Sequence, residues 1–113
     1  MKVLPHGDVE LEDVTAEGAT GVKIRWAITE DDGAPNFAMR VFEIEKGGHT
    51  PYHSHPHEHE VYILEGKGVL KFEDGKYPFE EGYVIFVDPK KRHGFYNTGN
   101  STLKFICIIP HKK

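Results

Sequence analysis

The sequence predicts an all-β domain, a small antiparallel barrel or sandwich of about seven to nine short strands. Short apolar segments alternate with polar residues, which is the pattern of half-buried strands. Seven prolines and twelve glycines separate these segments at close spacing. No segment carries the periodicity of an amphipathic helix. Closure into a barrel would also remove the open strand edges that favour aggregation.

The N-terminal half predicts two strands. In residues 22–28 (VKIRWAI), alternation puts one set of side chains on a common face: Val22, Ile24, Trp26 and Ile28. In residues 39–45 (MRVFEIE), the shared face carries Arg40, Phe42 and Ile44. Residues 8–18 are expected to form no more than a short turn.

The C-terminal half predicts further strands within residues 60–66, 68–75, 77–82, 82–89, 93–97 and 102–110. The segment 82–89 is apolar on both faces, as expected of a strand that is covered on each side. Residues 73–76 (EDGK) predict a hairpin turn in which Asp74 and Gly75 supply positive φ angles. Residues 97–100 (NTGN) predict another turn.

Length and charge limit the possible functions. A chain of 113 residues is expected to form one domain, residues 1–113. Its formal charge of −4 gives no bulk attraction to nucleic acid. The longest apolar run, residues 105–109, is too short to span a membrane, and the first residues show no secretory signal. The single cysteine, Cys107, fits a reducing compartment, so we expect a cytoplasmic protein.

Residues 49–68 (HTPYHSHPHEHEVYILEGKG) carry five of the eight histidines within eleven positions. On a strand, His53 and His55 would point the same way, about 6–7 Å apart. His59 has the same parity, although Pro56 interrupts the pattern, and His93 is the expected fourth donor. Imidazoles are ligands for divalent transition metals. A loose metal-scavenging tract and a structural zinc site are the alternatives, although structural zinc sites usually use cysteines.

The spacing of these residues resembles the two motifs of cupins. Gly47, His53, His55, His59 and Gly66 match the first motif, with five, one, three and six residues between them. Gly82, His93 and Asn97 match the second, with ten and three residues between them. Histidine replaces the usual glutamate, for which Glu60 is the alternative ligand. The turn before His93 is altered to residues 88–92 (DPKKR), which leaves its shape open.

The resemblance implies a jelly-roll barrel, or double-stranded β-helix, of the cupin_2 or RmlC-like type. It also implies a four-histidine metal site at His53, His55, His59 and His93. The barrel core is expected at about residues 36–110, with strands in residues 1–35 exchanged or packed at a homodimer interface. Ile106 and Ile108 face away from the core, so Trp26 in the N-terminal strand or a second subunit should cover them.

Alternation also predicts the wall of a dry, partly aromatic pocket that suits a small ligand. Its expected residues are Arg40, Phe42, Val61, Ile63, Phe95, Phe105 and Cys107. Arg40 is unusual there because an unpaired charge on an apolar face is costly. It could bind a carboxylate of the substrate, reach solvent at the strand end, or pair with a glutamate.

Four neutral imidazoles would leave a bound ion its full positive charge and two open positions. The ion could be manganese, iron, nickel, copper or zinc, and the residues alone do not choose among them. The leading hypothesis is an enzyme that oxidises a small organic molecule with dioxygen or peroxide. A redox-neutral isomerase or decarboxylase is the second hypothesis, and a non-catalytic module that binds a small ligand is the third. No residue is predicted as a catalytic acid or base.

Overall fold

The computed structural model describes residues 1–111 and shows a curled antiparallel β-sheet. The expected all-β class is confirmed. The strands in this part of the chain are β1 (Glu12–Asp13), β2 (Thr20–Ile28), β3 (Phe37–His49), β4 (His59–Glu65), β5 (Lys67–Phe72), β6 (Gly75–Glu80), β7 (Val84–Val87), β8 (His93–Asn97) and β9 (Leu103–Pro110). Two single-turn 3₁₀ helices accompany them, η1 (His6–Asp8) and η2 (Glu30–Asp32). No helix within residues 1–111 has the length and apolarity needed to cross a bilayer.

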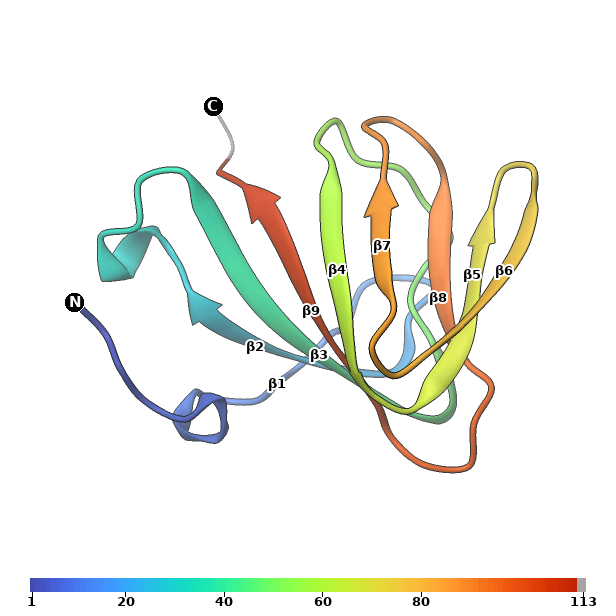
Figure 1. The fold of residues 1–113 in the computed structure, drawn as a ribbon, viewed down its shortest axis with the longest axis horizontal. Helices are drawn as coiled ribbons and strands as arrows, with labels where there is room; N and C mark the ends of the chain where they lie inside the picture. The colour runs from blue at the N-terminus through green and yellow to red at the C-terminus, as the bar shows by residue number, and fades with distance from the viewer. Residues whose placement is uncertain (112–113) are drawn as a thin grey trace.

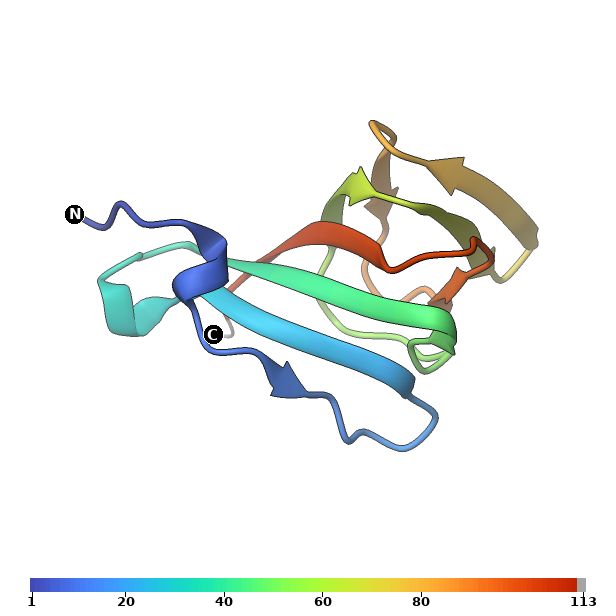
Figure 2. The same ribbon diagram turned by 90° about the horizontal axis from the view of Figure 1, so that it is seen from below.

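The sheet follows the order β6-β5-β8-β3-β9-β4-β7, and β2 and then β1 continue from β3. It curls so that β4 and β7 come round towards β5 and β8 (Figure 1). Two backbone hydrogen bonds continue the β4–β7 pairing into the β6–β7 turn: Gly82 donates to Ile63 over 2.9 Å, and Ile63 donates to Tyr83 over 3.0 Å. Seen from below, β1, β2 and part of β3 extend from this barrel as an arm (Figure 2).

The core lies inside the curl and follows the predicted alternation. Paired strands place directly opposed residues on one face, so Ile24, Phe42, Phe105 and Ile63 form one inward row. Phe105 stacks between two aromatic rings, with centroids 5.1 Å from Phe42 and 4.7 Å from Phe95. These contacts fill the floor of the barrel beneath the histidines.

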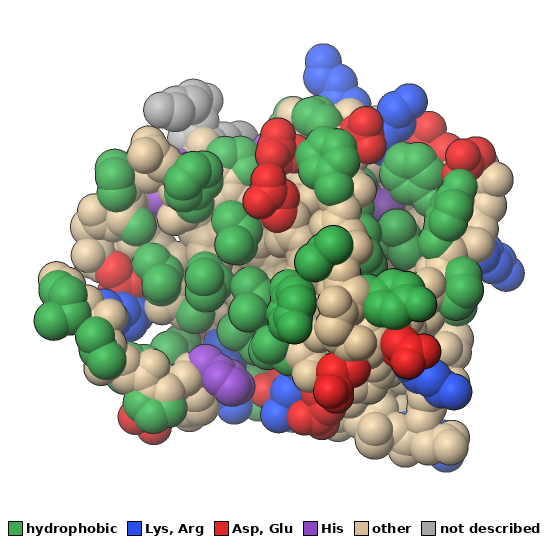
Figure 3. Space-filling model, viewed as in Figure 1, with side chains coloured by type: hydrophobic (Ala, Val, Ile, Leu, Met, Phe, Trp, Pro, Cys, Tyr) green, Lys and Arg blue, Asp and Glu red, His purple; other side chains and the backbone are tan. Residues whose placement is uncertain are grey.

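The outer face of the barrel departs from the sequence prediction. Val84 and Phe86 on β7 are 76% and 58% exposed, so this strand is covered on one face only within the chain. Trp26 pairs with Arg40 on the inner face, so it does not cover Ile106 and Ile108. Apolar side chains consequently gather on the surface over β9, β4 and β7 (Figure 3).

The predicted turns are present, with one difference. β5 and β6 form a hairpin whose last pair is Phe72 with Gly75, and Gly75 has φ of 152°. Asp74 does not share the positive φ that was expected of it. After β8, the buried Asn97 donates to the carbonyls of Ile44 and Ser101, each over 2.9 Å, and accepts from Gly99. This side chain therefore ties the turn to β3.

The altered loop at residues 88–92 keeps a tight turn. Lys90 adopts φ of 68°, a left-handed conformation that is uncommon for a residue with a side chain. Its backbone N–H donates to the carbonyl of His55 over 2.6 Å. The loop before His93 is thereby fastened to the segment that carries the other histidines.

Candidate metal centre

Backbone pairing brings the histidine-rich segment against β8. His53 and His93 form an isolated antiparallel bridge, in which each N–H donates to the other's carbonyl over 3.1 and 2.9 Å. A Cβ atom at Gly94 would lie only 3.3 Å from the carbonyl oxygen of Pro51, so this close approach favours glycine. Residues 54–58 are irregular rather than a strand, and His59 then opens β4.

The structure gathers the four histidines named from the sequence. The ring centroids of His53 and His55 are 4.2 Å apart, and those of His59 and His93 are 4.6 Å apart. The ring centroids of His55 and His93 are 6.2 Å apart. Four imidazoles from three separate parts of the chain therefore face one another at the end of the barrel.

The donor atoms are close but do not enclose a common point. The Nε2 atoms of His53 and His55 are 3.1 Å apart. Two adjacent nitrogen ligands with metal–nitrogen bonds of about 2.0–2.1 Å are separated by about 3 Å, so this spacing suits one ion. As the side chains stand, no three His, Cys, Asp or Glu residues within 1–111 are arranged to hold a metal.

Hydrogen bonding leaves ring nitrogens available for a ligand. Nδ1 of His93 lies 3.0 Å from the carbonyl oxygen of Lys91, which requires Nδ1 to carry the proton and leaves Nε2 with a free lone pair. Metal-binding histidines are commonly oriented by such a bond. Nδ1 of His59 is buried without a hydrogen-bond partner. A group bound among the rings would satisfy a nitrogen of this kind.

The environment keeps the imidazoles uncharged. Burial, followed by the neighbouring imidazoles, lowers the pKa of His59 to about 3 and that of His55 to about 4. Burial also lowers the pKa of His53 and of His93. All four rings are therefore neutral at pH 7, which is the form that coordinates metal.

Two neighbouring residues are placed differently from the four histidines. Glu60 is exposed on the outer face, where it pairs with Phe86 and Ile108. Its carboxylate therefore points away from the rings, whereas the His59 side chain is buried among them. The ring of His57 lies parallel to that of His55, with centroids 5.1 Å apart, at the rim of the cluster.

The rings open into an inner pocket of about 330 Å³. Five of the residues predicted for its wall line it: Arg40, Phe42, Phe95, Phe105 and Cys107. The other two, Val61 and Ile63, are buried in the core and do not line it. The sequence did not lead us to predict Trp26 as a pocket residue, although it lines this pocket. Its shared parity with Val22 and Ile24 could have identified it.

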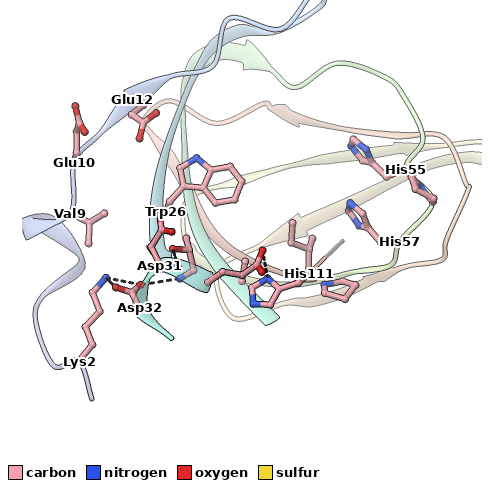
Figure 4. Close-up of a pocket in the computed structure, with 16 residues that line it drawn as sticks. Lys2, Val9, Glu10, Glu12, Trp26, Asp31, Asp32, His55, His57 and His111 are labelled. Atoms are coloured by element: carbon pink, nitrogen blue, oxygen red, sulfur yellow. Dashed lines mark hydrogen bonds and ion pairs between the residues drawn. The ribbon is translucent and has the colours of Figure 1, made fainter. Parts of the chain in front are cut away.

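An outer pocket of about 800 Å³ adjoins the inner one, since Glu12, Trp26 and His55 line both. Figure 4 shows Trp26 on one wall and His55 and His57 on the opposite wall. Carboxylates border the side formed by the arm, and Asp32 among them pairs with Lys2 over 3.1 Å. This arrangement gives the histidine cluster an open approach from solvent.

The fold and the pocket define a small β-barrel with a histidine-lined ligand cavity. Residues 40–109 match the family model described as the cupin domain. The chain therefore belongs to the cupin family, and the resemblance seen in its motifs is confirmed.

Similar proteins with described activities differ from one another. The structure of the polyketide cyclase RemF from Streptomyces resistomycificus is 34% identical with a TM-score of 0.93, covering 99% of this chain and 80% of that one. The oxalate-binding protein of Thermotoga maritima is 35% identical over 59% of this chain and 56% of its own length. The glucose-6-phosphate isomerase of Pyrococcus abyssi is 34% identical over 72% of this chain and 49% of its own. The chain thus spans about half the length of these two curated relatives.

We expect the metal-free protein to lose stability as pH falls from about 7.5 to about 5.5. The unfolded chain takes up protons near the ordinary histidine pKa of 6.5, whereas the folded cluster takes them up only at lower pH. Protonation therefore favours unfolding throughout this window. Urea unfolding with a chelator present, followed by Trp26 fluorescence, measures the effect.

A matched pair of variants assigns this pH dependence to the cluster. His59→Gln should reduce the slope of unfolding free energy against pH, whereas His6→Gln, at an exposed position, should leave it unchanged. Stability that is constant or rises on acidification would contradict the neutral state of the cluster.

Proposed function

We propose that this cupin binds one divalent transition metal ion through His53, His55, His59 and His93 and catalyses a redox-neutral reaction of a small organic carbonyl compound. The observation that carries the proposal is the gathering of four uncharged imidazoles at the mouth of an apolar pocket. The likeness to a polyketide cyclase along almost the whole chain supports the reaction class. Ring closure by addition of a carbon nucleophile to a carbonyl of the same molecule needs no oxidant.

The donor set fits a metal ion of borderline softness. Neutral imidazoles would leave a bound ion its full charge, so the ion would supply Lewis acidity towards a carbonyl group. Around the reacting group, Phe42, Phe95 and Phe105 supply an apolar wall that excludes water. His93 is held in one tautomer by Lys91, so its free nitrogen stays directed for binding.

Two other functions draw on the same site. Oxidation of a small molecule with dioxygen is the second candidate, because four nitrogen ligands suit redox-active iron, copper or manganese and leave positions free. Binding without catalysis is the third, and it is supported by the likeness to an oxalate-binding protein. The three differ in whether product forms and whether dioxygen is consumed.

We also propose that the chain forms a homodimer through its outer apolar face. Tyr62, Val84 and Phe86 are 46%, 76% and 58% exposed there, next to Ile106 and Ile108. Monomeric proteins rarely leave so continuous an apolar surface in water. A second copy presenting the same face would cover both surfaces at once.

The metal ligands are tested by a pair of adjacent substitutions. Protein purified without an affinity tag should contain about one equivalent of transition metal per chain. His59→Ala should weaken metal affinity about 100-fold or more, whereas Glu60→Ala should leave it unchanged because its carboxylate faces outward. Competition with a chromophoric chelator measures both. Loss of metal only in Glu60→Ala would overturn the ligand assignment.

The reaction class is tested with zinc-loaded protein under argon. Deuterium exchange at the methyl group of pyruvate, followed by NMR, should be about tenfold faster or more than with chelator-treated protein. The reason is that enolisation needs a Lewis acid but no oxidant. Equal rates with and without metal would contradict this function. Substrate-dependent dioxygen uptake by iron-loaded protein, with no anaerobic exchange, would establish oxidation instead.

The dimer is tested by light scattering at micromolar concentration. The protein should have twice the mass of one chain, and Phe86→Glu should convert it to monomer by placing a charge in the buried interface. Val3→Ser removes an exposed apolar side chain of the N-terminal segment, which shares no hollow with β4, β7 or β9, and should leave the dimer intact. A monomeric parent protein would rule the dimer out.

A further inference from the structure

Arg40 is a cationic side chain on the wall of the inner pocket. It lies on β3 between Trp26 and Cys107, which are its paired residues on the flanking strands β2 and β9. Its guanidinium carbon lies 5.6 Å from the Trp26 ring centroid and 5.0 Å from that of Phe42. The two aromatic rings therefore fix the guanidinium within the same cavity that the four imidazoles line.

The charge of Arg40 has no compensating anion among residues 1–111. No carboxylate there forms an ion pair with it. Nη2 donates to Sγ of Cys107 over 3.0 Å, and Nε is buried without an acceptor. Burial raises the pKa of Cys107, so its sulfur is an uncharged thiol and a weak acceptor. Glu12 and Asp13 also line the pocket but are exposed at its mouth.

Arg40 is half-buried, and its Nε is fully buried without an acceptor, an arrangement that is costly for folding alone. Arg40 lines the same pocket as the four uncharged imidazoles, so its guanidinium is placed to bind a ligand there. A guanidinium presents a planar set of donors that matches a carboxylate, and its weak hydration suits a partly dry site. The aromatic rings beside it suit the flat, apolar body of such a ligand.

We propose that Arg40 binds the carboxylate of the substrate, which makes the ligand of this pocket a small, flat organic acid. The carboxylate replaces Cys107 as the acceptor for Nη2 and accepts a second hydrogen bond from Nη1. The rest of the molecule then extends past the phenylalanines towards the histidines. The orientation of a reacting carbonyl towards the histidines rests on the proposed metal function. The binding of the carboxylate by Arg40 does not.

Benzoate and benzamide are the probes, since they have nearly the same shape and differ in charge. Titration calorimetry is performed on the full chain, both zinc-loaded and chelator-treated. Benzoate should bind about tenfold more tightly than benzamide, or better, because only the carboxylate compensates the charge of the half-buried guanidinium. Arg40→Gln should abolish this preference by weakening benzoate binding more than benzamide binding. Arg40→Lys should retain part of it because the charge remains but the planar donor set is lost.

Arg92→Gln is the matched control, because Arg92 lies over Tyr52 outside the pocket and should not affect the preference. Metal affinity is measured on the same preparations, and Arg40→Gln should not reduce it. Equal binding of the two probes, undetectable benzoate binding, or a preference that survives in Arg40→Gln would each overturn the proposal. Arg40-dependent benzoate binding by a protein that takes up no metal would keep the anchor and refute the proposed function.

Discussion

The reciprocal backbone hydrogen bonds between His53 and His93 are the constraint on which the site depends. Residues 54–58 have no strand pairing of their own, so they would be free to move without a tether at each end. Upstream of the bridge, Thr50 exchanges bonds with Phe95, donating through its N–H and accepting at Oγ1. Downstream, Lys90 donates to the carbonyl of His55. Together these bonds hold an irregular segment against a regular strand, with the imidazoles directed inward.

This arrangement concentrates groups that disfavour one another. Four imidazoles are packed at centroid separations of about 4–6 Å, and Arg40 adds a positive charge in the same cavity. After burial and the other imidazoles, Arg40 is a further cause of the lowered pKa of His55 and His59. Such a site opposes folding when its ligands are absent, and ligands that bind only the folded state offset the cost. The imidazoles would offset their cost by binding a metal ion, and Arg40 would offset its own by binding an anion.

The sequence predicted the strands well because alternation reports directly which side of a strand is buried. It also placed His59 correctly inward and Glu60 outward, since both lie on β4. The strand argument for His53 and His55 was wrong in its reason, because His55 lies within the irregular segment 54–58 and only His53 pairs, through the bridge to His93. Non-local pairing of this kind leaves no local pattern. Parity alone also failed to separate Val61 and Ile63, which fill the core, from Phe95 and Phe105, which reach the cavity.

The charges of the two pockets impose a selection on the ligands that reach the histidines. Five acidic residues line the outer pocket: Glu10, Glu12, Glu30, Asp31 and Asp32. Lys2 is the single lysine among the described residues that line it. Metal cations are drawn towards such a border, and its effect extends over roughly the Debye length of about 8 Å at physiological ionic strength. The Coulomb cost for an anion grows with its charge, so a phosphate dianion is disfavoured more than a monocarboxylate. An acidic entrance would therefore disfavour phosphorylated sugars more than singly charged acids, which agrees with the ligand class proposed for Arg40.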